Sequence, residues 1–353
     1  MSKISKLQKN IPDGLDGILI SSEISQRYLT GFNYTDGYVV VTREKAFMLA
    51  DFRYIEAAKK FESDELQIVM LKSAVIDLTR IFHENSLKNV GYEDNIVVCS
   101  KYAKMCKDFS EVVEFYPIGE LLDSMREVKD EIEVEKITRA QRIAEAGFEH
   151  MLNFIKPDMT EREVALELEF FMRKNGAEAS AFDVIAVSGT ASSMPHGVPR
   201  DVKLEKGFLT LDFGAVVDGY LSDMTRTIVI GKADDEMKRV YNTVLEAQLA
   251  ALDYVSAGKS GYDCDKVARD IIDKAGFGEC FGHGLGHGVG MYIHEAPRVS
   301  PVNKNNLNVG NIVTVEPGIY LEGKYGVRIE DMVYLTETGC INLTKSPKEL
   351  IEL

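Results

Sequence analysis

The sequence is poor in cysteine and contains no apolar run long enough to span a membrane. The cysteines are odd in number, scattered, and form no Cys-x-x-Cys pair: Cys99, Cys106, Cys264, Cys280 and Cys340. This pattern argues against a disulfide framework and predicts free thiols in a reducing compartment. The residues after Met1 lead into no apolar segment typical of a signal peptide, so we expect a cytoplasmic protein.

Positive charge is scarce relative to negative charge. The chain has 41 lysines and arginines against 56 aspartates and glutamates, a formal net charge of −15. Such a chain is poorly suited to nucleic acid or to an anionic membrane, and we expect neither as a partner. Its 45% hydrophobic and 27% charged residues are ordinary for a globular protein, and 353 residues suffice for two domains.

The first third of the chain lacks a glycine loop that could hold a phosphate, and its single histidine, His83, is interpreted as structural or solvated. Short apolar segments alternate there with helical patterns, which predicts a small α/β domain. The expected strands are residues 17–20, 38–41, 46–49, 67–71 and 89–91, and the expected helices are residues 51–61, 75–84 and 100–109. Charged residues of both signs become frequent after residue 122, so we expect domains over residues 1–124 and 125–353.

Four helices are expected in the second domain, with strands between them. The first ends before Pro157 and carries an apolar stripe at spacings of three and four: Ile137, Ala140, Ala144, Phe148, Met151 and Ile155. Thr160 and Glu163 form a capping box that begins the second helix. The expected extents of the last three are 160 to 176, 234 or 235 to 255, and 263 to 275.

Three of the six histidines lie in one glycine-rich stretch, residues 281–294. Glycine at every second position between residues 282 and 288 argues against a helix. An extended backbone would point His283, Leu285 and His287 the same way, and the glycines would let another group approach the main chain. A glycine-rich turn with incidental histidines is the alternative, and carboxylates elsewhere in the chain favour the first interpretation.

The dipeptide Asp218-Gly219, between two alternating apolar segments, is a strong signal for a two-residue hairpin turn. That turn pairs Asp212 with Thr225, and it places Asp212 and Asp223 on one face as diagonal neighbours. Such neighbours lie about 7–8 Å apart at the backbone, so their carboxylates can converge. Two adjacent carboxylates repel each other unless one is protonated or a cation lies between them. An ion-paired surface strand is the alternative interpretation.

A second hairpin carries Glu316 and Glu330. A two-residue turn at Gly323-Lys324 would place these glutamates on opposite faces. An odd-length loop, or a bulge near Gly318, would return them to one face. We expect one of these two corrections, on grounds of function and not of pattern.

The candidate ligands are Asp212, Asp223, His287, Glu316 and Glu330. Four carboxylates and one imidazole without sulfur suit two divalent cations in a catalytic site, with Mn²⁺ or Co²⁺ expected first and Zn²⁺ or Fe²⁺ possible. Two such cations together can deprotonate a shared water and polarise a carbonyl. His283 and His294 remain for hydrogen bonding or proton transfer. On the residues alone, His196 is interpreted as part of a loop and His150 as an ordinary helix residue.

At these residues the chain resembles the pita-bread-fold metallopeptidases, in particular the prolidases and aminopeptidases P. The resemblance spans about residue 129 to the C-terminus and is carried by residues 211–214, 222–227, 282–288, 294–297, 315–320 and 327–331, with Pro195-His196-Gly197 as a further segment. It implies an α+β pita-bread catalytic domain. The first third resembles the creatinase/prolidase N-terminal domain, on layout more than on motif.

The resemblance also implies roles. Asp212 and Asp223 would bind one metal; His287, Glu316 and Glu330 would complete the pair, with Asp223 and Glu330 bridging. A hydroxide that bridges the metals would attack the carbonyl of an Xaa–Pro bond in a small peptide. Glu316 would pass the proton, His283 and His294 would steady the substrate and the oxyanion, His196 would close the site over proline, and Arg328 would support Glu330.

Arg298 resembles an arginine with which prolidases bind the free carboxylate of a dipeptide, a natural role for a guanidinium. We therefore expect an Xaa-Pro dipeptidase, with an aminopeptidase P as the alternative. If Arg298 is an ordinary surface arginine, it does not favour a dipeptidase. A homodimer is implied by the family. A catalytically inactive binding module and a hydrolase of another bond, such as a phosphoester, are the remaining alternatives.

Overall fold

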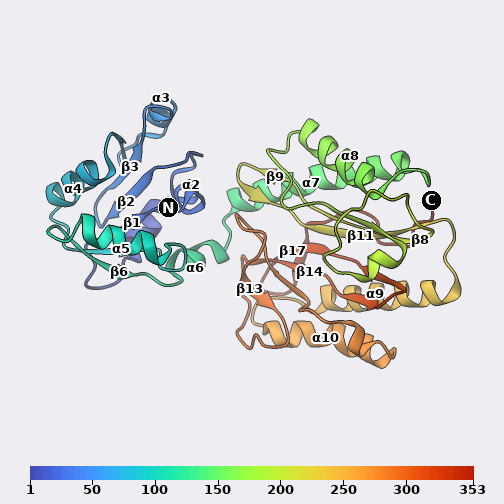
Figure 1. The fold of residues 1–353 in the computed structure, drawn as a ribbon. Coiled ribbons are helices and arrows are strands. Elements are labelled where there is room, and N and C mark those ends of the chain that lie inside the picture. Colours follow the sequence, from blue (N-terminus) through green and yellow to red (C-terminus); the bar gives the residue numbers. More distant parts are fainter. The chain divides into compact units, whose positions relative to one another are not determined.

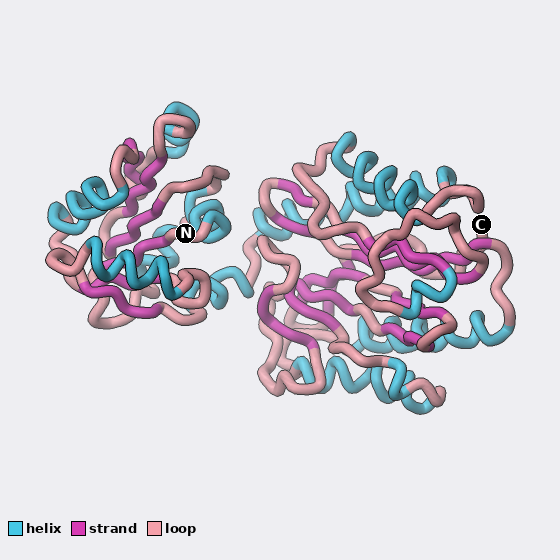
Figure 2. The backbone as a smooth tube through the Cα atoms, in the orientation of Figure 1, coloured by secondary structure: helices cyan, strands magenta, loops and turns pink.

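A computed structural model describes residues 1–353, and the chain divides into two compact units, Met1–Met125 and Arg126–Leu353. The division falls within helix α6 (Leu121–Glu127), one residue after the expected boundary. The elements of each unit are shown in Figure 1, and their helices, strands and loops are distinguished in Figure 2. None of the helices combines the length and the apolar character needed to cross a membrane.

The N-terminal unit is built on a six-stranded mixed sheet with the order β4-β3-β2-β1-β5-β6. Its strands are β1 (Gly17–Ile20), β2 (Tyr38–Thr42), β3 (Ala46–Ala50), β4 (Leu66–Met70), β5 (Asn89–Tyr92) and β6 (Glu114–Pro117). Its helices are α1 (Lys3–Lys9), α2 (Glu23–Thr30), α3 (Ile55–Ala58), α4 (Ala74–Glu84) and α5 (Cys99–Asp108), with a 3₁₀ turn η1 (Lys59–Phe61). The α/β organisation predicted for this part is confirmed, with α1, α2 and β6 in addition.

The helix expected over residues 51–61 is much shorter than predicted. The main-chain N–H of Arg53 donates to the Asp51 side chain at 2.9 Å, and that of Tyr54 donates to the Asp51 carbonyl at 3.0 Å. These bonds form a turn, and helix α3 begins only at Ile55. Residues 59–61 continue as the 3₁₀ turn η1, so the prediction is wrong only for the residues of the Asp51 turn that precede α3.

The C-terminal unit contains a three-stranded sheet, β11-β8-β7, a five-stranded sheet, β13-β12-β14-β17-β18, and two two-stranded ribbons. Strands of the first half are β7 (Ile185–Ser188), β8 (Gly207–Phe213), β9 (Val216–Val217), β10 (Tyr220–Leu221) and β11 (Met224–Ile230). Strands of the second half are β12 (Gly286–Gly288), β13 (Glu295–Val299), β14 (Ile312–Val315), β15 (Gly318–Leu321), β16 (Tyr325–Arg328), β17 (Asp331–Leu335) and β18 (Cys340–Asn342). Short 3₁₀ turns are η2 (Gly189–Ser193) and η3 (Gly278–Cys280).

Four long helices cover these strands: α7 (Glu131–Phe154), α8 (Glu161–Lys174), α9 (Asp235–Tyr254) and α10 (Gly261–Lys274). Figure 1 shows the strands between α7 and α8 on one side and α9 and α10 on the other. The predicted stripe of α7 packs in one apolar core with α8, β8 and β11, whereas α9 and α10 share a second core with β14 and β17. Each pair of helices therefore packs on strands that carry candidate ligands.

The helix starts follow from side-chain caps. Thr160 and Glu163 form the predicted capping box of α8, and Asp234 caps α9. Helix α10 begins earlier than expected: the Ser260 side chain accepts from the main-chain N–H of Asp263 at 3.0 Å, so Asp263 is the third helical residue and not the first. A serine three residues before an acidic residue is itself a capping signal.

Candidate metal centre

The first hairpin has the predicted register. Asp212 lies opposite Thr225 in the β8–β11 ladder, and Val217 lies opposite Tyr220 beside the Asp218-Gly219 turn. Asp223 follows β10 and is buried. The hairpin therefore presents Asp212 and Asp223 to one cavity, which both residues line.

The second hairpin also has one continuous antiparallel register. Val315 pairs with Asp331, and Gly318 pairs with Arg328, which places Glu316 opposite Glu330. The strands β15 and β16 are joined by the three residues 322–324, so the predicted odd-length loop is confirmed and no bulge is required. Because opposite residues of an antiparallel pair share a face, both glutamates point into the same cavity.

His287 enters the cluster from strand β12. Its Nδ1 lies 3.1 Å from the carbonyl oxygen of Gly288, and as a donor to that oxygen it leaves Nε2 directed at the carboxylates. Nε2 lies 3.2 Å from Glu316 Oε1 and 3.7 Å from Asp223 Oδ2. The glycines on either side permit the close approach that the sequence predicts, since a Cβ on Gly286 would come within 2.0 Å of the Thr314 carbonyl oxygen.

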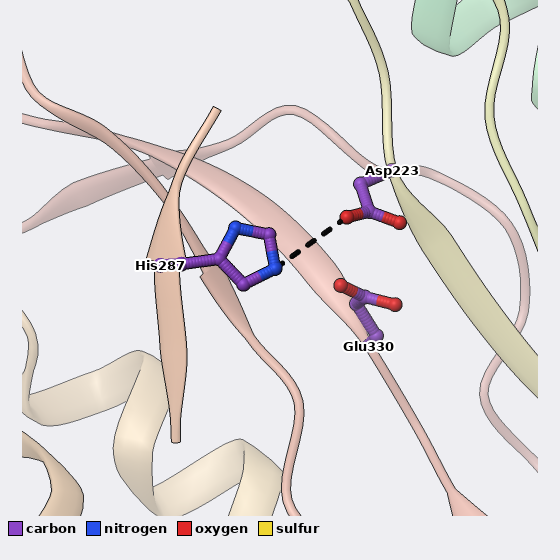
Figure 3. A group of neighbouring side chains, drawn as sticks. All are labelled: Asp223, His287 and Glu330. Atoms are coloured by element: carbon purple, nitrogen blue, oxygen red, sulfur yellow. Dashed lines mark ion pairs between the residues drawn. The ribbon is translucent and has the colours of Figure 1, made fainter. Parts of the chain in front are cut away.

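Figure 3 shows Asp223, His287 and Glu330 pointing toward one another from three separate segments. One ligand atom from each lies within 4.8 Å of the others, and all three residues are buried. Carboxylate oxygens that converge on one imidazole nitrogen require a positive charge among them, either a proton or a metal ion. This donor set fits a divalent cation.

Asp212 adds a further carboxylate to this group of possible metal ligands. Its Oδ2 accepts a hydrogen bond of 2.6 Å from Nη2 of Arg328, whereas its Oδ1 is buried and has no hydrogen-bond partner. An unpaired buried carboxylate oxygen is costly unless something binds it. Asp212 and Asp223 line the same cavity, so the two carboxylates could bind a second cation between them.

The electrostatics of the cluster are those of crowded, buried acids. Burial and the neighbouring carboxylate of Glu330 raise the pKa of Asp223 well above its usual range. Burial and Glu316 do the same to the pKa of Glu330, and burial raises the pKa of Asp212 although Arg328 opposes the shift. Burial also acts on Glu316, but the hydrogen bond and charge of His287 outweigh it and lower its pKa to about 2. A cation would relieve the repulsion among these groups.

Two threonines without a predicted role orient the ligands. The Thr225 hydroxyl donates to Glu330 Oε2 at 2.6 Å. The Thr314 hydroxyl donates to Glu316 Oε1 at 3.0 Å and accepts from the main-chain N–H of His287 at 3.0 Å. Both could have been found from the strand pattern, because Thr225 pairs with Asp212 and Thr314 shares a face with Glu316.

Tyr320 is a further residue without a predicted role. Its hydroxyl accepts from Arg328 Nη1 at 2.8 Å and lies 2.9 Å from His283 Nε2. Burial lowers the pKa of His283, which favours a neutral ring that accepts the Tyr320 proton. His283 and His287 both line the cavity, whereas Leu285 packs in the apolar core. The common direction predicted for all three is wrong for Leu285, because only residues 286–288 form a regular strand.

The remaining candidates lie at the wall of a cavity of about 570 Å³ that also contains the ligands. His294, His196 and Arg298 are exposed side chains that line it, and the His294 ring meets the His287 ring edge-on at 4.4 Å. The apolar part of the wall consists of Phe182, Val184, Ile185, Pro195, Val198, Pro199 and Ile293. All predicted site residues are therefore brought to one cavity.

The other two histidines lie elsewhere, as predicted. His83 is exposed on α4 of the N-terminal unit. His150 on α7 lies 2.7 Å from Glu167 and stacks on Phe171 at 4.4 Å between ring centroids. Neither lines the cavity.

Comparisons with known proteins agree with this geometry. Residues 135–337 match the model of metallopeptidase family M24, and residues 3–128 match the creatinase/prolidase N-terminal domain. The chain is 42% identical to the peptidase YqhT of Bacillus subtilis over 342 residues, 96% of each chain.

Solved structures give the same result for the whole chain. An Xaa-Pro dipeptidase from Bacillus anthracis superposes with a TM-score of 0.94 at 43% identity over 99% of both chains. An X-Pro aminopeptidase from Thermotoga maritima has a TM-score of 0.93 at 38% identity, covering 99% of this chain and 100% of the other. With its buried acidic cluster and its two matched domains, the chain is a metallopeptidase of family M24 with a creatinase/prolidase N-terminal domain.

Proposed function

We propose that this metallopeptidase binds two divalent cations, Mn²⁺ or Co²⁺ before Zn²⁺ or Fe²⁺, and hydrolyses the Xaa–Pro bond of dipeptides. Asp212 and Asp223 would hold one cation, His287 and Glu316 the other, and Asp223 and Glu330 would reach both. The oxygen-rich, sulfur-free donor set supports this choice of metals. Homodimer formation and a cytoplasmic location stay predictions from the sequence.

When bound, a pair of such cations polarises the scissile carbonyl and lowers the pKa of water. Glu316, which accepts a hydrogen bond of 3.0 Å from Thr314, would take up a proton and deliver it to the leaving proline nitrogen. His294 and His196 line the exposed side of the cavity, where they can orient the peptide. His283 Nε2 lies 2.9 Å from the Tyr320 hydroxyl, and this histidine would steady the substrate together with His294.

The observation that carries the dipeptide assignment is the state of Arg298. It lies opposite His287 in the β12–β13 ladder, lines the cavity, and its guanidinium makes no side-chain hydrogen bond or ion pair within the chain. A free guanidinium at that position can bind the terminal carboxylate of a dipeptide in bidentate fashion. The second candidate, an aminopeptidase P, has the Thermotoga maritima neighbour in its favour.

The deciding experiment compares substrate length. The purified protein loaded with Mn²⁺ is assayed on Met–Pro and on Met–Pro–Ala, as wild type and as Arg298→Ala, with the exposed Arg139→Ala as matched control. We expect Arg298→Ala to raise KM for the dipeptide by about 10- to 100-fold, because a charge-assisted hydrogen bond is lost. A preference for the tripeptide that persists in Arg298→Ala would assign an aminopeptidase P.

The same preparation tests for catalysis itself. A binding module would take up no pair of cations and would show no hydrolysis that depends on Mn²⁺ or Co²⁺. Titration of metal-free protein with Mn²⁺ by calorimetry, followed by the peptide assay at each ratio, separates this alternative from an enzyme.

A further inference from the structure

Two side chains of helix α10 contact the main chain on both sides of His283. Arg269 donates from Nη1 to the Phe281 carbonyl oxygen at 2.8 Å and from Nη2 to the His283 carbonyl oxygen at 2.7 Å. Asp265 accepts the main-chain N–H of Leu285 at 2.9 Å through Oδ1. The two side chains therefore bind the main chain at residues 281, 283 and 285.

The same two side chains hold each other. Arg269 Nε lies 2.8 Å from Asp265 Oδ2, and Arg269 Nη2 lies 3.0 Å from Asp265 Oδ1. This bidentate pairing fixes the plane of the guanidinium and so the direction of its remaining donors. Asp265 is 1% exposed, so its charge is compensated almost entirely by Arg269 and the Leu285 N–H.

The Phe281 ring contacts both Arg269 and His283. The Arg269 guanidinium lies 4.3 Å from the centroid of the Phe281 ring, and the Phe281 ring meets the His283 ring edge-on at 5.0 Å. Phe281 is buried and contacts both the arginine and the histidine. Cation–π and edge-to-face contacts of this kind each favour one orientation.

The main chain around His283 is not held by regular secondary structure, although its ring contacts the Gly284 carbonyl oxygen and the Tyr320 hydroxyl. His283 lies between Gly282 and Gly284, outside any regular strand, and a Cβ on Gly282 would meet nothing within 4 Å. A backbone with glycine on both sides of a residue can adopt many conformations. Helix α10, in contrast, is anchored by its buried face of Cys264, Ala268 and Ile272, so it offers a rigid support.

We propose that Asp265 and Arg269 are positioning residues that hold His283 in the orientation needed for hydrolysis. The inference rests on the proposed function, in which His283 steadies the substrate. Neither residue lines the cavity, so any effect on catalysis must pass through the segment they hold.

Hydrogen exchange tests the restraint without substrate. Amide exchange of the peptide covering residues 281–285 is measured by mass spectrometry in metal-free wild type, Arg269→Met, Arg269→Lys and a control, Lys266→Met. Lys266 pairs at 2.6 Å with Asp270 on the exposed side of the same helix and touches no residue of the segment. We expect exchange in 281–285 to be at least about tenfold faster in Arg269→Met than in the control, with Arg269→Lys between them. Equal protection in Arg269→Met and Lys266→Met would overturn the proposal.

A double-mutant cycle tests the route to catalysis. In the Mn²⁺-loaded protein, Arg269→Met should lower kcat for Met–Pro by about 10- to 100-fold with little change in KM or in metal content. In the His283→Ala background the same substitution should have almost no further effect, because the residue it positions is gone. Equal loss in both backgrounds would mean a general structural role and would overturn the proposal.

The two measurements keep this inference separate from the proposed function. If wild type and Lys266→Met cleave no Xaa–Pro peptide, the proposed function fails, whereas the exchange result still decides whether Asp265 and Arg269 hold the segment. If Arg269→Met does not fold, the comparison of Arg269→Lys with Lys266→Met gives the same decision.

Discussion

Arg328 holds Asp212 by a hydrogen bond of 2.6 Å to Oδ2, while the buried Oδ1 of the same carboxylate has no hydrogen-bond partner. The guanidinium thus sets the plane of the carboxylate and leaves one oxygen for a cation. Its Nε donates at 3.0 Å to Thr225, whose hydroxyl donates to Glu330. One arginine therefore orients proposed ligands on two hairpins, although the sequence pointed only to its support of Glu330.

We expect Arg328→Met to weaken binding of divalent cations by about 10- to 100-fold, because both proposed ligands lose their orienting partner. Calorimetric titration of the metal-free protein with Mn²⁺ measures the change. Arg139→Met, which removes an exposed arginine paired with Asp218 at 3.2 Å, is the matched control. Unaltered Mn²⁺ affinity in Arg328→Met would contradict the orienting role.

Asp223→Ala and His283→Ala should have different effects on metal binding. Asp223 supplies an atom to the cluster of converging ligands, so its loss should release metal and abolish hydrolysis. His283 contacts Tyr320 and no ligand, so its loss should lower kcat while the protein still binds metal. Metal content after dialysis, measured by mass spectrometry beside kcat, distinguishes the two. The reverse outcome would exchange the proposed roles.

Gly214→Ala should destabilise the hairpin that carries Asp212 and Asp223. A Cβ at this position would lie 1.8 Å from the Ser222 carbonyl oxygen, and main-chain atoms cannot move aside as a flexible side chain can. We expect a loss of about 3 kcal/mol or more in the free energy of unfolding, measured by urea denaturation. Gly339→Ala, where a Cβ meets nothing within 4 Å, should change stability little. Equal effects of the two substitutions would refute the steric argument.

Glu161→Gln should reduce stability in a pH-dependent way. Burial disfavours the charge of Glu161, but hydrogen bonds from Arg200 and Ser188 outweigh it and lower its pKa below the usual value of 4.5. A lowered folded-state pKa means that the carboxylate stabilises the fold above pH 4.5 and loses that effect as pH falls through the folded-state value.

The difference in unfolding free energy between wild type and Glu161→Gln should therefore be constant, about 2 kcal/mol, between pH 7 and 5 and should shrink below pH 4.5. Urea denaturation at pH 7, 5 and 4 measures it. A difference that grows toward acid pH would have the wrong sign for this interaction.

Local features were predictable wherever one side chain or one spacing decides them. The Asp218-Gly219 turn determined the pairing of Asp212 with Thr225, since a two-residue loop permits one register. The capping box of Thr160 and Glu163 determined the start of α8. The helix predicted over residues 51–61 begins only at Ile55, because the Asp51 side chain and carbonyl bind the main-chain N–H groups of Arg53 and Tyr54 in a turn, which the apolar spacing does not reveal.

The sequence by itself determined which residue types could bind metal and which of them share a strand face, because spacing along a chain sets the direction of side chains. Only the tertiary structure decided that two hairpins and strand β12 converge on one cavity, with Thr225, Thr314 and Tyr320 between their ligands. It also decided that Asp265 and Arg269 hold the segment of His283. Such contacts join positions far apart in the chain, and they arise from how two helix pairs pack on their strands, which no local spacing encodes.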